Sequence, residues 1–480
     1  MLFNSVDFAI FLPVVFLLYW FVFHKNITVQ NVLLVVASYF FYGWWDPRFL
    51  LLIVFSSLVD YSVGLLLSRT QAQRARNLLL LASLVVNLGF LGFFKYYNFF
   101  LENFVEAFTF FGRDIGASSL NIILPVGISF YTFQTLSYTI DVYNGKLKPT
   151  KNIVSFFAFV SFFPQLVAGP IERATNLLPQ FYKKRVFVYS EAVDGMRQIL
   201  WGLFKKVVIA DNCARFANII FENYADLSGS TLVFGAFFFA LQIYGDFSGY
   251  SDIAIGVSRL FGFKLMQNFA FPYFSRDIAE FWRRWHISLS TWFRDYLYIP
   301  IGGSRGGIGK KIRNVFVIFV VSGFWHGANW TFIAWGFLNA LYFVPIMLLN
   351  KNRIHTDTVA EGKIFSSVTE LFQILVTFML TLLAWVFFRA PSVTDAVLYI
   401  KKTFTFSIFS IPANFQEWLI TLFFIAFMIC VEWFQRNRKH ALEFTQGKLP
   451  RHFRWSLYVL LFFSLFWYGG AQQDFIYFQF

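Results

Sequence analysis

The sequence predicts an all-α integral membrane protein that crosses the bilayer many times. Only 14% of the 480 residues are charged and 58% are hydrophobic, whereas an ordinary soluble domain carries about 25% charged residues. The mean hydropathy is +0.58, and the charges cluster so that long stretches contain none. Such stretches are the signature of membrane-spanning helices. The composition excludes a disordered chain, a collagenous fibre, a disulfide scaffold and a cytosolic enzyme.

The apolar stretches predict about eleven elements at membrane depth, some of them re-entrant. In lipid each backbone must satisfy its own hydrogen bonds, which favours helices, and the alternation expected of porin strands is absent. Two stretches are weaker, Phe49–Ser68, which contains Asp60, and Trp418–Val431. The others are, in order, Phe8–His24, Asn26–Trp45, Asn77–Phe94, Ile115–Ile140, Asn152–Ile171, Leu227–Gly245, Asn314–Asn350, Leu371–Phe388 and Trp455–Gln473.

The basic residues predict the orientation, because cytoplasmic loops hold an excess of Lys and Arg. Lys25 follows the first span, and Arg69, Arg74 and Arg76 follow the third, so both loops are expected in the cytoplasm and the N-terminus outside. A cleavable signal peptide is not expected, since no Lys or Arg precedes the first apolar run. Six basic residues between Arg436 and Arg454 precede the last span, whose end is then also outside.

The net charge of +14 does not predict nucleic-acid binding, because the basic residues lie in short loop clusters and no base-reading module accompanies them. Cys213 and Cys430 are far apart in the sequence. They support neither a disulfide framework nor a metal knuckle. No HExxH or carboxylate–histidine spacing is present, so no metal site is expected.

The longest charge-free stretch, Asn314–Asn350, is too long for one crossing and has basic residues on both sides. With both flanks in the cytoplasm, the chain must enter the membrane and return. His326 follows Arg313 by thirteen residues, which is about 20 Å along a helix and beyond the middle of a hydrocarbon core about 30 Å thick. Ionisable groups at that depth are costly and mark functional sites. The alternative is a buried histidine that only hydrogen-bonds a neighbouring helix.

A second segment, Arg276–Pro300, has aromatic and apolar residues at helical spacing and charged residues on the other face. This pattern predicts an amphipathic helix that either lies at the interface or dips into the protein. His286 falls at the edge of its apolar face, next to Trp282 and Leu289, where a structural role is favoured from position alone. The glycines of 302–307 predict a flexible turn.

The remaining titratable residues suggest fewer roles. Four histidines lie in or beside basic loops and are expected to be solvated: His24, His355, His440 and His452. Five acids lie near membrane depth: Asp60, Asp141, Asp246, Asp252 and Glu172. These acids either form a proton or cation path or pair with inward arginines such as Arg173 and Arg259, and pairing is favoured for most of them.

Three motifs carry a resemblance to a known family: QIYGDFSGYSD at 242–252, FWRRWHISLS at 281–290 and SGFWHGANW at 322–330. Their order and spacing resemble the membrane-bound O-acyltransferase (MBOAT) superfamily. The run 298–303 and the end of the chain, 475–480, resemble its bacterial AlgI-like alginate O-acetylation branch. The teichoic-acid D-alanyltransferases (DltB-like) are a more distant branch. The resemblance covers nearly the whole chain and implies one integral membrane domain over 1–480, with a motif core at about 120–350 and C-terminal spans at 366–480.

The resemblance implies a helical body that is thin at its centre, with a funnel from each side of the membrane. The family's invariant histidine matches His326 and its second characteristic histidine matches His286. His326 is then the general base on an acceptor hydroxyl, while His286 and Asn329 orient groups or stabilise the oxyanion. Four further residues are candidates for lining the tunnel or supporting the base: Trp325, Asp246, Ser248 and Arg283.

The implied reaction moves an acetyl group from a cytoplasmic thioester, either acetyl-CoA or a carrier-protein thioester, toward an exopolysaccharide or cell-wall polymer outside. No bound cofactor is expected. The implied location is a bacterial inner membrane, and the implied partner is a separate periplasmic or extracellular protein resembling SGNH hydrolases. Transfer of D-alanyl or another acyl group is an alternative. A secondary transporter or flippase is an alternative of another class, but the two similar halves typical of transporters are not visible.

Overall fold

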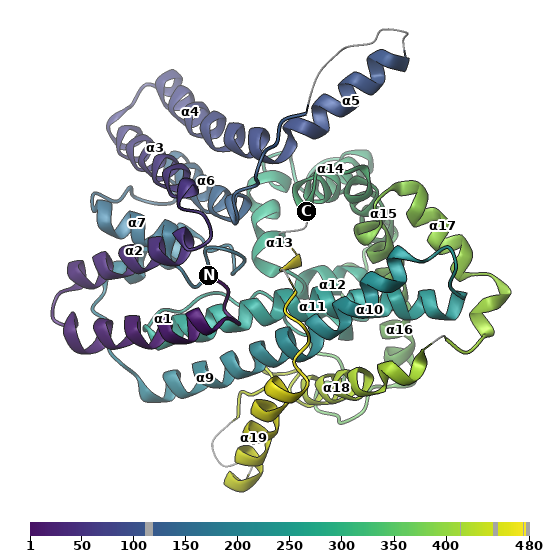
Figure 1. The fold of residues 1–480 in the computed structure, drawn as a ribbon. Coiled ribbons are helices and arrows are strands. Elements are labelled where there is room, and N and C mark those ends of the chain that lie inside the picture. Colours follow the sequence, from purple (N-terminus) through teal and green to yellow (C-terminus); the bar gives the residue numbers. More distant parts are fainter. Residues whose placement is uncertain (111–118, 413, 445–449, 474, 477–480) are drawn as a thin grey trace. The chain divides into compact units, whose positions relative to one another are not determined.

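The computed structural model describes residues 1–110, 119–412, 414–444, 450–473 and 475–476. Within these ranges the regular elements are all helices (Figure 1). Six of the described helices are long and apolar enough to cross a membrane, and two shorter apolar helical segments precede them. Large apolar side chains are exposed along most of these helices, as expected of surfaces that face lipid. The all-α, multi-pass prediction is confirmed.

The chain forms two compact units, which are described separately. Unit 1 contains residues 1–188 and 258–265, and unit 2 contains residues 189–257 and 266–480. All seven residues singled out as candidates from the sequence belong to unit 2. The prediction of a single membrane domain over 1–480 stays a prediction.

Unit 1 is built around α3, α4 and α6, which pack against one another, with α7 against α2 and α3 (Figure 1). Asn26 and Asn152 cap α2 and α7 through their side chains. The elements are α1 Val6–Leu17, η1 Leu18–Val22, α2 Ile27–Gly43, η2 Pro47–Phe49, α3 Leu50–Arg69, α4 Gln73–Leu91, η3 Gly92–Tyr96, α5 Tyr97–Phe110, α6 Ile128–Tyr143, α7 Ile153–Ser161, α8 Ala174–Leu177 and η4 Leu178–Tyr182.

The acid in the third predicted span lies inside unit 1. Asp60 is fully buried and accepts hydrogen bonds from Ser83 Oγ, from Asn87 Nδ2 at 2.8 Å and from Thr139 Oγ1 at 2.8 Å. Hydroxyl and amide donors of α4 and α6 therefore satisfy this carboxyl group. The prediction that this acid pairs with an arginine is therefore wrong for Asp60.

Two spans predicted in unit 1 need correction. The stretch Asn152–Ile171 contains only α7, whose nine residues rise about 14 Å, which is half the thickness of the hydrocarbon core. The following residues, such as Phe162 and Phe163, are buried within the protein, so their apolar character reflects a core and not a lipid-facing span. In the stretch Ile115–Ile140 the helix begins at Ile128, and Ile115 lies outside the described residues.

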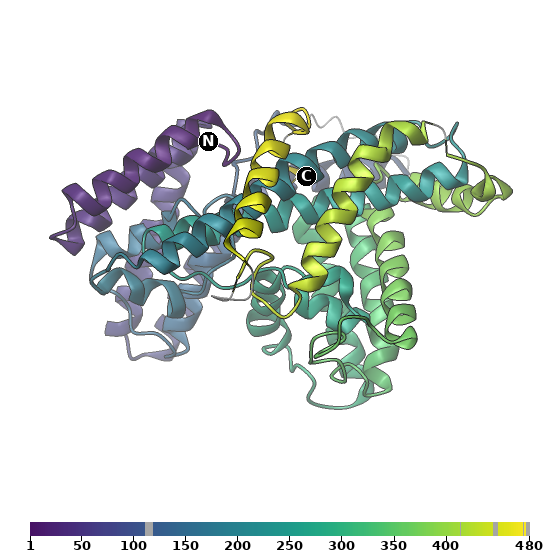
Figure 2. The ribbon, with the colours of Figure 1, turned by 90° about the horizontal axis from the view of Figure 1, so that it is seen from below.

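Unit 2 holds the long helix α11 and the helices that surround it. The C-terminal helices α18 and α19 pack on the teal segment α9–η5–α10, with both contacting η5 (Figure 2). The elements are α9 Tyr189–Leu203, η5 Phe204–Ala210, α10 Asp211–Glu222, α11 Gly229–Leu260, η6 Pro272–Phe274, α12 Ile278–Arg284, α13 Ile287–Phe293, η7 Arg294–Tyr298, α14 Ile308–His326, α15 Trp330–Leu348, α16 Val368–Arg389, α17 Val393–Thr403, η8 Phe406–Phe409, α18 Phe415–Phe434 and α19 Arg451–Trp467.

The segment α9–η5–α10 was not predicted from the sequence. Its charges broke the apolar pattern, yet several of them are buried. Lys205 pairs with Asp252 at 2.6 Å, and Lys206 pairs with Asp246 at 2.6 Å. The preference for pairing among the acids is therefore confirmed for these two, but their partners are lysines of η5. Helix α11 accordingly runs fifteen residues beyond the predicted end at Gly245.

The single amphipathic helix predicted over Arg276–Pro300 is wrong. The chain forms α12 and then α13, with a break at Trp285 and His286, and His286 has a left-handed backbone (φ 42°). The cause is Asn268, whose carbonyl accepts from Ile287 N at 2.8 Å and whose Oδ1 accepts from Ser288 N at 3.1 Å. Because Asn268 satisfies the first amides of α13, the preceding helix can stop. The predicted apolar face is nevertheless buried.

The helical hairpin predicted from the flanking charges of Asn314–Asn350 is present as α14 and α15, which pack tightly against each other (Figure 1). Two glycines allow the close approach. A Cβ at Gly323 would overlap the carbonyl oxygen of Phe332, and a Cβ at Gly336 would overlap that of Phe319. His326 is the last residue of α14 and therefore lies at the turn of the hairpin.

Candidate active site

His326 lies in an aromatic enclosure at the turn between α14 and α15. Its side chain is 7% exposed. The imidazole meets the rings of Trp325, Trp335 and Phe388 edge-on, with centroids 4.9, 5.2 and 5.3 Å away. The three rings thus enclose the imidazole and leave little of it accessible to solvent.

The turn after His326 is fixed by two residues of the HGAN sequence. A Cβ at Gly327 would overlap the ring of Phe332, so only glycine fits there. Asn329 caps α15, because its Oδ1 accepts from Thr331 N at 3.0 Å, and its Nδ2 donates to the carbonyl of Pro391 at 3.1 Å. Asn329 thus holds the hairpin turn and ties it to the end of α16.

His286 is more deeply buried, at 2% exposure. Its ring contacts Phe247 of α11 and Phe269, both with centroids 6.0 Å away. Burial lowers the pKa of His286 to about 3, so the imidazole is neutral at pH 7. Its position at the start of α13 follows from the helix break and not from an apolar helix face.

The two histidines belong to one aromatic cluster. Trp285, next to His286, lies 5.2 Å from Trp385 of α16. Trp385 stacks on Trp335 at 5.8 Å and an interplanar angle of 18°, and Trp335 contacts His326. Trp285, Trp335 and Trp385 therefore connect the surroundings of the two histidines through a continuous aromatic cluster.

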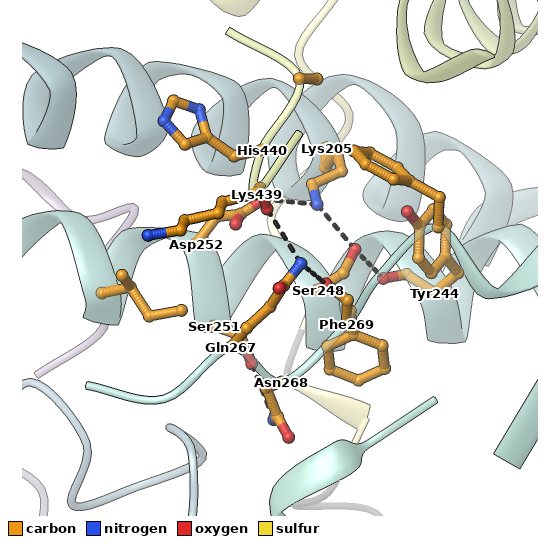
Figure 3. A pocket seen from close by; sticks show the side chains of 13 residues that line it. Lys205, Tyr244, Ser248, Ser251, Asp252, Gln267, Asn268, Phe269, Lys439 and His440 are labelled. Carbon is orange, nitrogen blue, oxygen red and sulfur yellow. Dashed lines mark hydrogen bonds and ion pairs between the residues drawn. The ribbon is translucent and has the colours of Figure 1, made fainter. Parts of the chain in front are cut away.

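A polar pocket lies against α11, between this helix, η5 and the segments 267–271 and 439–441. Figure 3 shows Lys205 directed at Ser248 and Asp252 in this pocket. The ammonium group donates to Ser248 Oγ at 2.9 Å, and Ser248 donates to the carbonyl of Tyr244 at 2.6 Å. The lining residues are Lys205, Tyr244, Ser248, Ser251, Asp252, Ile255, Gln267, Asn268, Phe269, Phe271, Lys439, His440 and Ala441.

Asn268 joins the pocket to His286. Its Nδ2 donates to Ser251 Oγ at 3.0 Å, on the pocket side. Its Oδ1 accepts from Ser288 Oγ at 2.8 Å, and Ser288 Oγ lies 3.5 Å from His286 Nδ1. A row of hydroxyl and amide groups therefore leads from the pocket to the buried imidazole.

Asp246 and Arg283 lie elsewhere. Asp246 contacts the Lys206 ammonium group at 2.6 Å and accepts from the backbone amide of Ile476 at 2.8 Å. Arg283 is exposed and donates to the carbonyls of Asn352 and His355 at 2.7 and 2.6 Å, so it holds the loop after α15. Of the candidates for lining a tunnel, Ser248 lines the pocket and Trp325 lines the enclosure of His326.

Sequence reasoning missed Lys205, Asn268 and His440. Lys205 and Asn268 lie outside the apolar stretches and outside the quoted motifs, so no spacing pointed to them. His440 was expected to be solvated, but it is 2% exposed and donates from Nε2 to Asp194 at 3.1 Å. One signal in the sequence pointed to this contact. The helical spacing of the apolar residues in α9 places Asp194 on the side of the helix that faces the protein.

Comparisons with known proteins identify the family. Residues 147–381 match the model of the MBOAT, membrane-bound O-acyltransferase family. The chain is 40% identical to the probable alginate O-acetylase AlgI of Pseudomonas aeruginosa, over 84% of this chain and 74% of that protein. It is 39% identical to the peptidoglycan O-acetyltransferase of Helicobacter pylori, over 84% and 79%. The teichoic acid D-alanyltransferase of Bacillus subtilis is 30% identical over 46% and 58%.

Proposed function

Because the chain belongs to the membrane-bound O-acyltransferase family, we propose that it moves an acetyl group from a cytoplasmic thioester across the membrane to an acceptor hydroxyl, for O-acetylation of an exopolysaccharide or cell-wall polymer. Two relatives that cover most of the chain are named for O-acetylation of alginate and of peptidoglycan, which are both polysaccharides. The more distant relative named for D-alanyl transfer matches less than half of the chain. Acetyl is therefore favoured over D-alanyl as the transferred group.

The observation that carries the proposal is the buried, aromatic enclosure of His326 at the hairpin turn. A neutral imidazole there acts as general base on the acceptor hydroxyl. The hydroxyl oxygen bonds to the acetyl carbon as the proton passes to His326. The carbon–sulfur bond then breaks, and the thiolate takes the proton from the imidazolium. The products are the acetyl ester and the free thiol, and His326 returns to its neutral form.

His286 has a second role in this proposal. A neutral imidazole has one N–H to donate, and a donor directed at the developing oxyanion stabilises the transition state. The fixed backbone and the two flanking rings of His286 supply the preorganisation that such a donor needs. Asn329 contributes by holding the turn that carries His326, since both ends of its amide are engaged in that turn.

The polar pocket beside Lys205 suits the donor. Acetyl-CoA and acyl-carrier thioesters share a pantetheine arm with two amides and a phosphate. Gln267, Asn268 and Ser251 offer amide and hydroxyl partners, and Lys439 adds a positive charge. The positive-inside rule places the loop containing Lys439 on the cytoplasmic side. We therefore assign the donor to this side and the acceptor to the opposite side, reached at the hairpin turn.

The proposal includes a location and a partner. The protein lies in a bacterial inner membrane with both termini outside, because the basic clusters mark the cytoplasmic loops. A separate periplasmic or extracellular protein resembling SGNH hydrolases then passes the acetyl group to the polymer. This assignment rests on the resemblance of the motifs to the alginate branch.

The test is acyl transfer in liposomes that contain the purified protein together with its partner protein, with radiolabelled acetyl-CoA or acetyl-carrier protein inside and polymer outside. We expect His326→Ala to lower the rate by about 10²- to 10⁴-fold, the usual contribution of a general base. His24→Ala, at an exposed loop position, is the matched control and should transfer at the wild-type rate. Unchanged transfer by His326→Ala would reject the mechanism. Substrate counterflow without any donor would instead support a transporter.

A further inference from the structure

After α19 the chain lies against η5 and α10 of the same unit. We call residues 468–473 with 475–476 the docked segment. Gly470 N donates to the carbonyl of Val207 at 3.0 Å, and Asn212 Nδ2 donates to the carbonyl of Tyr468 at 2.8 Å. These bonds attach the beginning of the docked segment to η5 and to the first turn of α10.

The far part of the docked segment is held by a buried cluster of charges. Lys206 pairs with Asp211 at 2.9 Å and with Asp246 at 2.6 Å, and all three side chains are nearly inaccessible. The Lys206 ammonium also donates to the carbonyl of Gln473 at 3.3 Å. Asp246 accepts from the backbone amide of Ile476 at 2.8 Å. Lys206 and Asp246 thus each make one hydrogen bond to the backbone of the docked segment.

The anchor places one aromatic ring beside the candidate active site. Phe475 is 3% exposed, with its ring 5.1 Å from Phe247 and 5.4 Å from Tyr250. Phe247 also contacts the imidazole of His286, with centroids 6.0 Å apart. The ring of Phe247 therefore contacts both the docked segment and His286.

We propose that the docked segment is a positioning element for the acyl transfer: Lys206 and Asp246 anchor it, and Phe475 holds Phe247 against His286. The inference rests on the proposed function. His286 has a left-handed backbone, which only surrounding contacts maintain, and Phe247 is one of the two rings that set its imidazole. A displacement of about 1 Å at a catalytic group costs as much as 10²-fold in rate. Phe475 acts through Phe247, and Asp246 acts through the backbone of the segment.

One experiment measures transfer kinetics in Phe475→Ala, which removes the ring and keeps the anchor. We expect kcat to fall by about 10- to 100-fold, while the KM for the thioester changes by less than about 3-fold, because the pocket beside Lys205 is intact. Phe475→Leu, which keeps most of the volume, should recover most of kcat. The matched control is Phe221→Ala, a buried phenylalanine that packs on Tyr399 instead. An equal fall in kcat for both alanine variants would overturn the positioning role.

A second experiment follows the docking itself and does not depend on activity. Ile476→Cys in a Cys430→Ser background puts a thiol at a buried position, and the remaining Cys213 is buried. We expect a membrane-permeant maleimide to label this thiol at least about 10-fold faster when Asp246→Ala is added. Equal labelling would overturn the anchor. A wild-type protein without acyl transfer would overturn the proposed function instead, and the labelling result would still decide the docking.

Discussion

Single residues carry the functional inference. His326 is identified from the sequence because it is the one histidine within the longest stretch without Asp, Glu, Lys or Arg, and the structure buries it among aromatic rings. The sequence provides weaker support for a functional role of His286. The case for that role rests on the helix break that Asn268 imposes. A side chain that caps a helix nineteen positions later in the chain leaves no local pattern, so sequence alone could not locate this contact.

Asp211 makes the anchor of the docked segment sensitive to pH. Burial raises the pKa of Asp211 to about 7, against the opposing charge of Lys206. A carboxyl group with a raised pKa holds its proton in the folded state, so its contribution to stability is full below its unfolded pKa of about 4 and is lost as the pH rises through 7. We expect the melting temperature in detergent to fall between about pH 6 and 8.

Asp211→Asn mimics the protonated acid and provides the control for this titration. The melting temperature of this variant should change less over the same interval, when both proteins are followed by intrinsic fluorescence. A wild-type protein that becomes more stable from pH 6 to 8, or a variant with the same slope, would contradict the assignment to Asp211.

At the scale of elements, the sequence predicted helices wherever their apolar pattern was continuous, and it failed where charges are paired inside the protein. Segment α9–η5–α10 was missed because Lys205 and Lys206 read as loop charges, although each meets an acid of α11. For the stretch Asn152–Ile171 the error was the opposite one, because a membrane span was predicted where the structure has a protein core. A protein core and a lipid bilayer select the same apolar residues. Hydropathy does not separate these two environments.

The α14–α15 hairpin, in contrast, followed from the charges that flank it, and its tight contact gives a prediction. Gly323→Ala places a methyl group where the carbonyl of Phe332 lies, so the helices must separate. We expect a loss of about 1–3 kcal/mol of stability together with reduced acyl transfer, because His326 is three residues away. Thermal unfolding and the liposome assay measure the two effects.

Gly309→Ala is the matched control on the same helix, since its new Cβ would meet open space. Alanine is the better helix former by about 1 kcal/mol, so this variant should be as stable as the wild type or more stable, with normal transfer. If Gly323→Ala behaves like Gly309→Ala, the close packing of the hairpin does not determine the position of His326.

For the whole molecule, the scarce charges predict an orientation. If Lys310 is cytoplasmic and α14, α15, α16, α18 and α19 each cross the membrane, the chain ends outside. Under the same assumption the basic cluster after α18 lies in the cytoplasm, which is where the positive-inside rule expects it. We therefore propose that the turn that carries His326 faces the outside and that the pocket beside Lys205 faces the cytoplasm.

Cysteine labelling tests this topology. In a Cys430→Ser background, Lys310→Cys and Lys351→Cys should react with an impermeant maleimide only after spheroplasts are permeabilised, because both lie at the open end of the hairpin. Ser410→Cys, in the exposed loop before α18, should react in intact spheroplasts. Labelling of 310 and 351 from opposite faces would mean that α14 and α15 do not enter and leave on one side. His326 would then not face the acceptor side, and transfer across the membrane would need a different base.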